Sequence, residues 1–148
     1  MTIAYSCVLF MGLFPYVAAG IAKKGFDQYD NSMPRQWLAQ QTGFRARANA
    51  AQANLFESLP LFFAAVIIAS INNAPQATID LLAIGFVIAR IAFLICYLAN
   101  WPTTRSIVWV AGLHLIKPLL PYSFPFSVLS ILFLLNASSK SNIERLPV

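Results

Sequence analysis

Polar side chains interrupt an otherwise apolar stretch that covers residues 44–71. Arg47, Asn54 and Glu57 are separated by seven and three positions. On a helix of about 3.6 residues per turn they fall within roughly a third of the circumference, so they form one polar stripe. A cation, an amide and a carboxylate on one face suit a ligand with charges of both signs. Ionisable groups at membrane depth cost about 3 kcal/mol unless they are paired or hydrated, so such a stripe points to function.

A second pair of polar residues, Arg90 and Tyr97, lies in the next apolar stretch, residues 76–99. Seven positions separate them, so they share one helical face. Glu57 is the natural partner for the charge of Arg90. A structural ion pair between two helices is one interpretation, but replacing a buried pair by apolar residues is often neutral or stabilising. A bound ligand explains the retained charges more readily.

The composition indicates which elements position these side chains. Of the 148 residues, 59% are hydrophobic and 10% are charged, and the mean hydropathy is +0.68. A soluble domain of this size needs more surface charge, whereas a membrane-spanning helix needs about 20 mostly apolar residues. The sequence therefore predicts a single all-α integral membrane domain with four transmembrane helices. We expect the spans at residues 3–22, 44–71, 76–99 and 103–118.

A proline-rich apolar segment follows the fourth predicted span. Residues 124–136 are too short for a full span, and Pro118, Pro121 and Pro125 each remove a backbone hydrogen-bond donor. We expect an extra interfacial or docked C-terminal helix there. A single long, kinked fourth helix is the alternative.

The distribution of lysine and arginine predicts the orientation, because short connections rich in these residues stay on the cytoplasmic side. The first and third connections and the adjoining helix ends hold Lys23, Lys24, Arg35, Arg45, Arg47 and Arg105, whereas the other side holds only Lys140 and Arg145. The N-terminus is therefore predicted outside, with the first and third connections cytoplasmic. The net charge of +5 then reflects topology and attraction to anionic membrane lipid, and we expect no nucleic-acid partner.

Metal and disulfide chemistry have little support in the sequence. Cys7 and Cys96 lie in separate apolar stretches without the paired spacing of a metal or redox motif, and His114 is the single histidine. We expect no metal cofactor.

The polar residues taken together resemble a known family, the membrane-associated proteins in eicosanoid and glutathione metabolism, abbreviated MAPEG. One part of the resemblance is formed by Arg47, Ala51-Gln52, Asn54, Glu57 and Pro60-Leu61-Phe62, in the predicted second helix. The other part is formed by Arg90, Tyr97, Pro102 and Arg105, in the predicted third helix and the loop after it. The order and spacing are similar to those of the family across residues 1–112.

The resemblance implies a left-handed four-helix transmembrane bundle in each subunit, a homotrimer, and glutathione as a co-substrate bound between subunits near the cytoplasmic face. The residues that would bind glutathione are Lys23, Arg47, Gln52, Asn54, Glu57, Arg90 and Tyr97. Arg105 matches the arginine that lies near the thiol in enzymatic members. Arg105 and Tyr97 are therefore the candidate catalytic residues.

The chemistry of glutathione suits this set, because the tripeptide carries two carboxylates and one ammonium. The cationic side chains would bind the carboxylates, Glu57 would accept the ammonium, and the amides of Asn54 and Gln52 would add neutral hydrogen bonds. A guanidinium at Arg105 would favour the thiolate, which is the nucleophile. The Tyr97 hydroxyl would polarise the thiol, although a tyrosine near a membrane interface also serves as an anchor.

Three positions differ from leukotriene C synthase-like members. Ala50 occupies a position where those members carry a ligand-binding arginine, and Ser58 and Phe93 occupy positions where they have tyrosines.

We expect a glutathione-dependent transferase or peroxidase that acts on lipophilic electrophiles or lipid hydroperoxides in the membrane. The alternative is a non-catalytic member that binds lipid or a membrane partner as an accessory subunit. A channel or transporter has less support, because the sequence contains no inverted repeat or matching pair of broken helices.

Overall fold

The computed structural model describes residues 1–25, 29 and 31–119, and in these residues every regular element is helical. The elements are α1 (Ile3–Ala22), α2 (Pro34–Ala39), α3 (Gly43–Ile71), α4 (Gln76–Leu98), α5 (Pro102–Ile116) and the 3₁₀ turn η1 (Lys117–Leu119). The C-terminal helix predicted at 124–136 lies outside the described residues.

Three helices, α1, α3 and α4, are long and apolar enough to cross a membrane. The prediction of an all-α integral membrane protein is confirmed at this level. The helix α5 has 15 residues, which is shorter than the roughly 20 residues of a typical span. The fourth span therefore stays a prediction.

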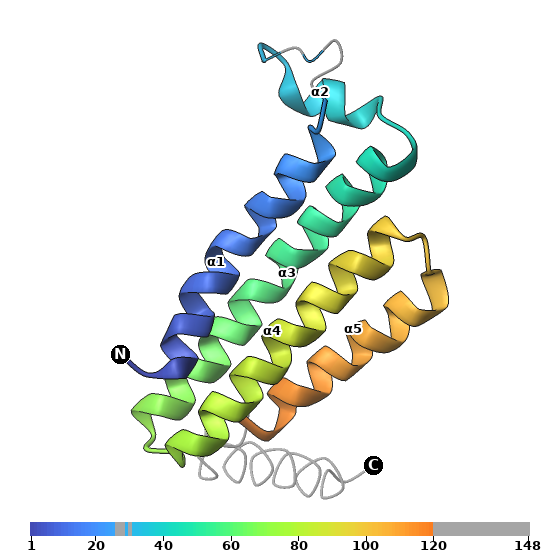
Figure 1. The fold of residues 1–148 in the computed structure, drawn as a ribbon. Helices are drawn as coiled ribbons and strands as arrows, with labels where there is room; N and C mark the ends of the chain where they lie inside the picture. Colours follow the sequence, from blue (N-terminus) through green and yellow to red (C-terminus); the bar gives the residue numbers. More distant parts are fainter. Residues whose placement is uncertain (26–28, 30, 120–148) are drawn as a thin grey trace, which may run out of the picture.

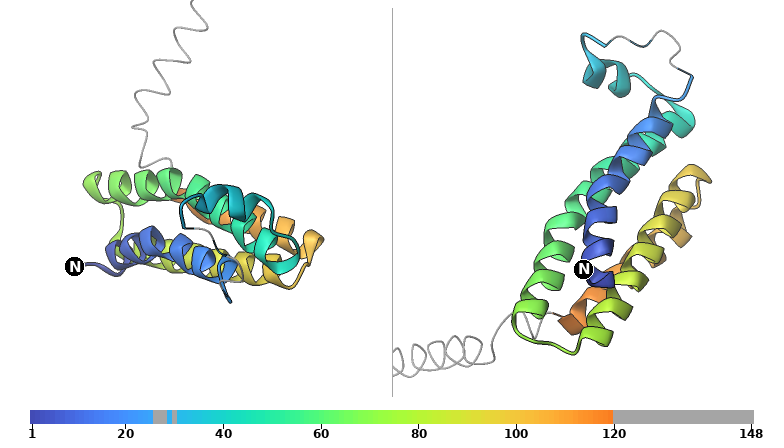
Figure 2. Two further views of the ribbon diagram at one scale, coloured as in Figure 1. Left: turned by 90° about the horizontal axis from the view of Figure 1, so that it is seen from above. Right: turned by 60° about the vertical axis from the view of Figure 1, so that its left-hand side comes forward.

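The four longer helices run in alternating directions and lie side by side (Figure 1). The helix α1 packs against α3 and α4, while α5 packs mainly against α4 at the edge of the molecule (Figure 2). The short α2 lies at the end opposite the N-terminus (Figure 1). This arrangement brings the start of α3, the end of α4 and the start of α5 to the same end of the molecule.

The turns between α3 and α4 and between α4 and α5 have the same construction. Each contains an asparagine with positive φ, 55° at Asn73 and 59° at Asn100, a left-handed conformation that asparagine tolerates better than most residues. In each turn the next residue's N–H donates to the carbonyl five positions back, at 3.0 Å. Pro75 is then the N-cap of α4 and Pro102 is the first residue of α5, positions where a missing N–H costs nothing. Antiparallel helices result from these short turns.

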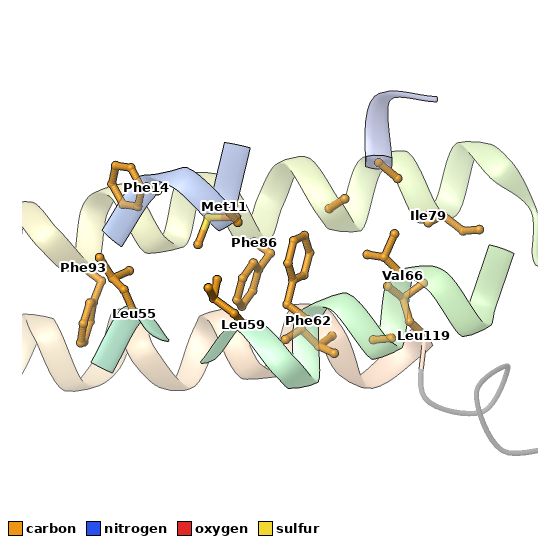
Figure 3. Close-up of a cluster of buried hydrophobic side chains, with 14 of the residues drawn as sticks. Met11, Phe14, Leu55, Leu59, Phe62, Val66, Ile79, Phe86, Phe93 and Leu119 are labelled. Atoms are coloured by element: carbon orange, nitrogen blue, oxygen red, sulfur yellow. The ribbon is translucent and has the colours of Figure 1, made fainter. Parts of the chain in front are cut away.

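The apolar core lies between α1, α3 and α4 (Figure 3). Near its centre the rings of Phe62 on α3 and Phe86 on α4 stack with their centroids 4.3 Å apart, and both side chains are fully buried. Met11 of α1 is buried in the same cluster. Small buried residues such as Ala18 and Ala51 let neighbouring helices approach closely.

The outer faces of the membrane helices carry large apolar side chains. Leu13 on α1 is 69% exposed, and Leu81 and Ile88 on α4 are 70% and 61% exposed. Extended apolar surface of this kind is unusual for a soluble monomer and is expected where helices contact lipid. The exposed surface thus agrees with the membrane setting.

Charged side chains from other helices cap both ends of α1. At its N-terminus, the Ala4 backbone N–H donates to Asp80 Oδ1 of α4 at 2.8 Å. Just beyond its C-terminus, Arg45 Nη2 of α3 donates to the Lys24 carbonyl at 3.1 Å. A carboxylate at a helix N-terminus and a guanidinium at a C-terminus both complement the helix dipole. These contacts fix α1 against its neighbours.

Candidate functional site

A cavity of about 400 Å³ lies between α3, α4 and α5. Its walls include Asn54 of α3, Phe93 and Tyr97 of α4, and Arg105, Ser106 and Trp109 of α5. Asn54, Tyr97 and Arg105 are all residues that the sequence predicts as ligand-binding or catalytic. The antiparallel fold brings these three distant positions to one cavity, which we call the α3–α5 cavity.

Arg105 lies in the first turns of α5 and its side chain packs over α4. The guanidinium carbon Cζ is 4.4 Å from the centroid of the Tyr97 ring, which is a cation–π contact. The Tyr97 ring in turn packs edge-on against Phe93, with centroids 5.0 Å apart. These contacts hold a positive charge and a phenol together on the cavity wall.

Asn54 supplies the polar group on the α3 side of the cavity. Its Oδ1 atom is buried and has no hydrogen-bond partner among the described residues. A buried acceptor left in this way costs about 1–3 kcal/mol. The amide oxygen is therefore a natural acceptor for an N–H donor of a ligand in the α3–α5 cavity.

Arg47 does not line the cavity but joins α3 to the end of α4. Its Nε donates to the Tyr97 carbonyl at 3.0 Å, and its Nη2 donates to the Leu98 carbonyl at 3.1 Å. Carbonyls in the last turn of a helix have no partner within that helix, and a cation there complements the helix dipole. Arg47 therefore holds the backbone of Tyr97, one residue of the cavity wall.

Arg90 is completely buried, with 0% exposure, and its guanidinium lies near two aromatic rings. Its Cζ is 4.7 Å from the centroid of Phe86 and 5.6 Å from that of Phe93. In the part of the chain that the structure describes, none of its three side-chain nitrogens has a hydrogen-bond partner.

The expected pairing of Arg90 with Glu57 is wrong for the single chain. Glu57 is exposed, whereas Arg90 is buried. Glu57 follows the buried Leu55 by two positions, a rotation of about 200° around α3. The side of α3 that carries Glu57 is therefore turned away from the core, so the two charges do not meet.

The MAPEG family model matches residues 3–119, a stretch that contains all the residues lining the α3–α5 cavity. The chain belongs to the MAPEG family. The resemblance noted in the sequence is thus confirmed. Comparisons with curated proteins and with solved structures gave no match. Membership supports a glutathione-related transferase or synthase type of function in the membrane.

The other predicted ligand residues of this MAPEG protein lie outside the α3–α5 cavity. Gln52 lines a second cavity of about 300 Å³ between α2 and α3, together with Asn49 and Ala50. Lys23, just beyond α1, donates to the Tyr29 hydroxyl at 3.0 Å, and its Nζ is 5.0 Å from the centroid of that ring. In a single chain, the predicted ligand set is therefore spread over several places and is not gathered in the α3–α5 cavity.

Three residues that the sequence did not single out, Ser106, Trp109 and Val110, also line the α3–α5 cavity of this MAPEG protein. Trp109 follows Arg105 by four positions, and residues four apart lie on the same side of a helix. The helical spacing from Arg105 therefore predicts Trp109 as a lining residue.

The lining of the α3–α5 cavity combines a guanidinium, a phenol, an amide and a hydroxyl with aromatic side chains. Such a set suits an organic ligand that carries anionic and amide groups next to an apolar part. Among the described residues, no group of three His, Cys, Asp or Glu side chains is placed to hold a metal ion.

Proposed function

We propose that this MAPEG protein is a glutathione-dependent transferase or peroxidase that acts on lipophilic electrophiles or lipid hydroperoxides dissolved in the membrane. One observation carries the proposal. Asn54, Tyr97 and Arg105, which come from three different helices, line one cavity, and each had been predicted from the sequence as a residue of the glutathione site. A chance meeting of three such residues is a weaker explanation than a shared ligand.

The chemistry follows from the Arg105 cation. A positive charge near the sulfur of glutathione stabilises the thiolate relative to the thiol, and the thiolate is the nucleophile. Tyr97 and Arg105 line the same cavity, with Cζ of Arg105 4.4 Å from the Tyr97 ring, and the Tyr97 hydroxyl would donate a hydrogen bond to the same sulfur. Asn54 Oδ1 would accept from an amide N–H of the tripeptide. The two donors and the acceptor would together orient the thiolate.

Two reactions are open to a thiolate held in this way. In conjugation, sulfur attacks an electrophilic carbon, a new S–C bond forms and the leaving group departs with its electron pair. In peroxide reduction, sulfur attacks one peroxide oxygen, the O–O bond breaks and the alcohol leaves after taking a proton. A second glutathione then reduces the sulfenic acid, giving the disulfide and water. The apolar outer faces of the helices would let a lipophilic acceptor arrive from the bilayer.

We further infer that the working unit is a homotrimer of left-handed four-span bundles. Gln52 lines the cavity between α2 and α3, and Glu57 is exposed, so one chain does not gather the whole predicted set. A neighbouring subunit that presents these residues to the α3–α5 cavity would complete it. Light scattering of the detergent-solubilised protein, corrected for bound detergent, measures the subunit number, and a monomeric mass would count against this assembly.

The orientation proposed for this protein places the α4–α5 turn on the cytoplasmic side and the N-terminus outside. Arg45, Arg47 and Arg105 lie at the start of α3 and of α5, at the same end of the molecule (Figure 1). Short connections rich in such residues stay cytoplasmic. Labelling of cysteines introduced at Thr2 and Thr103 with a membrane-impermeant reagent in intact cells tests it. Labelling at Thr103 alone would overturn the orientation.

The decisive test of function uses the full-length protein purified in detergent. Glutathione and a chlorodinitrobenzene-type acceptor are added, and thiolate absorbance and conjugation are recorded. We expect both signals in the wild type and a loss of about 100-fold or more in conjugation with Arg105→Ala. Arg45→Ala is the matched control, because Arg45 lies at the same end of the molecule but bonds the Lys24 carbonyl. Absence of thiolate and of glutathione binding at millimolar concentration in the wild type would overturn the enzyme proposal.

A non-catalytic, lipid-binding or accessory role is the second candidate, and the cavity between α2 and α3 favours it. The described residues that line it have amide and apolar side chains, including Gln52 and Ala50, and none of them is charged. With alanine at position 50, this cavity attracts a glutathione carboxylate less strongly than it would with an arginine there. Binding of a lipid without any thiolate signal would support this role over the first.

A further inference from the structure

Gly112 of α5 lies directly against the guanidinium of Arg90. A Cβ atom added at position 112 would be 2.6 Å from Nη2, 3.2 Å from Cζ and 3.4 Å from Nε of Arg90. A contact under 3.0 Å is essentially never seen for a real Cβ atom, so one group would have to move. Glycine is also less favourable than alanine in the interior of a helix. Glycine at position 112 is therefore explained by the space that the Arg90 guanidinium occupies.

The groups packed around Arg90 restrict the position of its guanidinium. The rings of Phe86 and Phe93 lie 4.7 and 5.6 Å from Cζ, and the side chain is completely buried. Phe93 also lines the α3–α5 cavity. The guanidinium is therefore held in a recess beside that cavity, with Gly112 as one wall and the two rings near it.

The hydrogen-bonding capacity of this guanidinium is unused within the described chain. Its Nε, Nη1 and Nη2 atoms are buried and have no hydrogen-bond partner there. A guanidinium presents five N–H donors in a planar fork that matches a carboxylate, so its geometry matters as well as its charge. Displacing the fork by about 1 Å is enough to weaken such a bidentate contact.

We propose that Gly112 is a positioning residue, which reserves the recess that holds the Arg90 guanidinium ready for the carboxylate of the thiol substrate. This inference rests on the proposed function. Gly112 sets the affinity for glutathione through the placement of Arg90 and has no part in the reaction at sulfur. A larger residue at position 112 raises the KM for glutathione and leaves kcat nearly unchanged.

The test compares Gly112→Ala with Gly85→Ala in the full-length protein in detergent. A Cβ at Gly85 of α4 would meet the Leu115 side chain of α5 at 3.2 Å, so this control tightens the same helix contact without touching Arg90. We expect Gly112→Ala to raise the KM for glutathione about tenfold with kcat within about twofold of wild type. Gly85→Ala should leave both constants near wild type.

A double-mutant cycle of Gly112→Ala and Arg90→Met, measured by Tm, tests the contact between the two residues without an activity assay. We expect Gly112→Ala to lower the Tm by about 4 °C in the wild-type background, through overpacking against the guanidinium. In the Arg90→Met background the guanidinium is gone, so the same substitution should lower the Tm by much less. Gly85→Ala should shift the Tm equally in both backgrounds. If Gly112→Ala does not fold alone, recovery of folding in the double variant supports the same coupling.

The outcomes separate this inference from the proposed function. Equal Tm losses in both backgrounds would show that Gly112 does not position Arg90. Coupled Tm losses with an unchanged KM would overturn the link to the carboxylate. A wild-type protein without glutathione binding would refute the proposed function and with it the substrate part of the inference, while the cycle would still decide the contact.

Discussion

Replacing Arg47 by methionine separates a structural role from a ligand-binding one. The substitution keeps an apolar stem of similar length and removes the guanidinium that donates to the Tyr97 and Leu98 carbonyls at 3.0 and 3.1 Å. Charge-assisted hydrogen bonds of half-buried groups and the complement to the helix dipole together amount to about 2 kcal/mol. For a chain of this size, that loss corresponds to a fall of about 4–8 °C in Tm.

The assay follows thermal unfolding of the detergent-purified protein by circular dichroism, at one scan rate for all variants because membrane proteins often unfold irreversibly. Arg45→Met is the matched control. Arg45 donates through two nitrogens to a single carbonyl, that of Lys24, at 3.1 and 3.4 Å in an exposed position, so we expect a loss below about 1 kcal/mol. Arg47→Met should also lower kcat, because it loosens the backbone of Tyr97.

One result would refute the reasoning on Arg47. If Arg47→Met unfolds within about 1 °C of wild type while the KM for glutathione rises by more than about tenfold, then Arg47 is a ligand cation and the hydrogen bonds to α4 contribute little. The sequence alone predicted that ligand role, so the experiment decides between the two interpretations.

Two further predictions concern single polar groups. Tyr97→Phe keeps the ring beneath Arg105 but removes the hydroxyl, and we expect conjugation to slow by about 100-fold with little change in Tm; an unchanged rate would assign Tyr97 a packing role only. Asp80→Ala removes the carboxylate that accepts from the Ala4 N–H at 2.8 Å, and we expect a loss of about 1–2 kcal/mol and of about 3–6 °C in Tm. A Tm equal to that of wild type after Asp80→Ala would contradict the capping role.

The helical membrane architecture was predictable because it depends on summed composition. The stretches at 3–22 and 76–99 are almost free of charge, and only a helix satisfies every backbone group of such a segment in lipid. The family was recognisable for a related reason, since its polar residues interrupt these stretches at fixed spacing. The all-helical fold, the three candidate spans and the family match agree with these predictions. Orientation is defined relative to a membrane and assembly requires further subunits, so both stay proposals.

The contacts of individual site residues were less predictable, because periodicity gives relative angles on one helix and not its rotation toward a neighbour. Arg47 and Asn54 share one stripe of α3, yet Arg47 bonds the end of α4 while Asn54 lines the α3–α5 cavity. The same uncertainty hid Trp109, which lines the cavity only because α5 turns that face toward α3. Helix rotation comes from packing against the core, where residues such as Phe62 are decisive.

The charges of Glu57 and Arg90, both in predicted membrane helices, support the assembled, ligand-binding form for two different reasons. Glu57 is exposed on α3 along with Ala50 and Ala53, and Arg90 is buried without a hydrogen-bond partner in the described chain. A lone charge in lipid costs about 3 kcal/mol, and small neighbours leave room for another helix to approach. Among the described residues of one chain, neither charge has a partner of opposite sign. A ligand with an ammonium and carboxylates, bound where a second subunit meets the first, would compensate both.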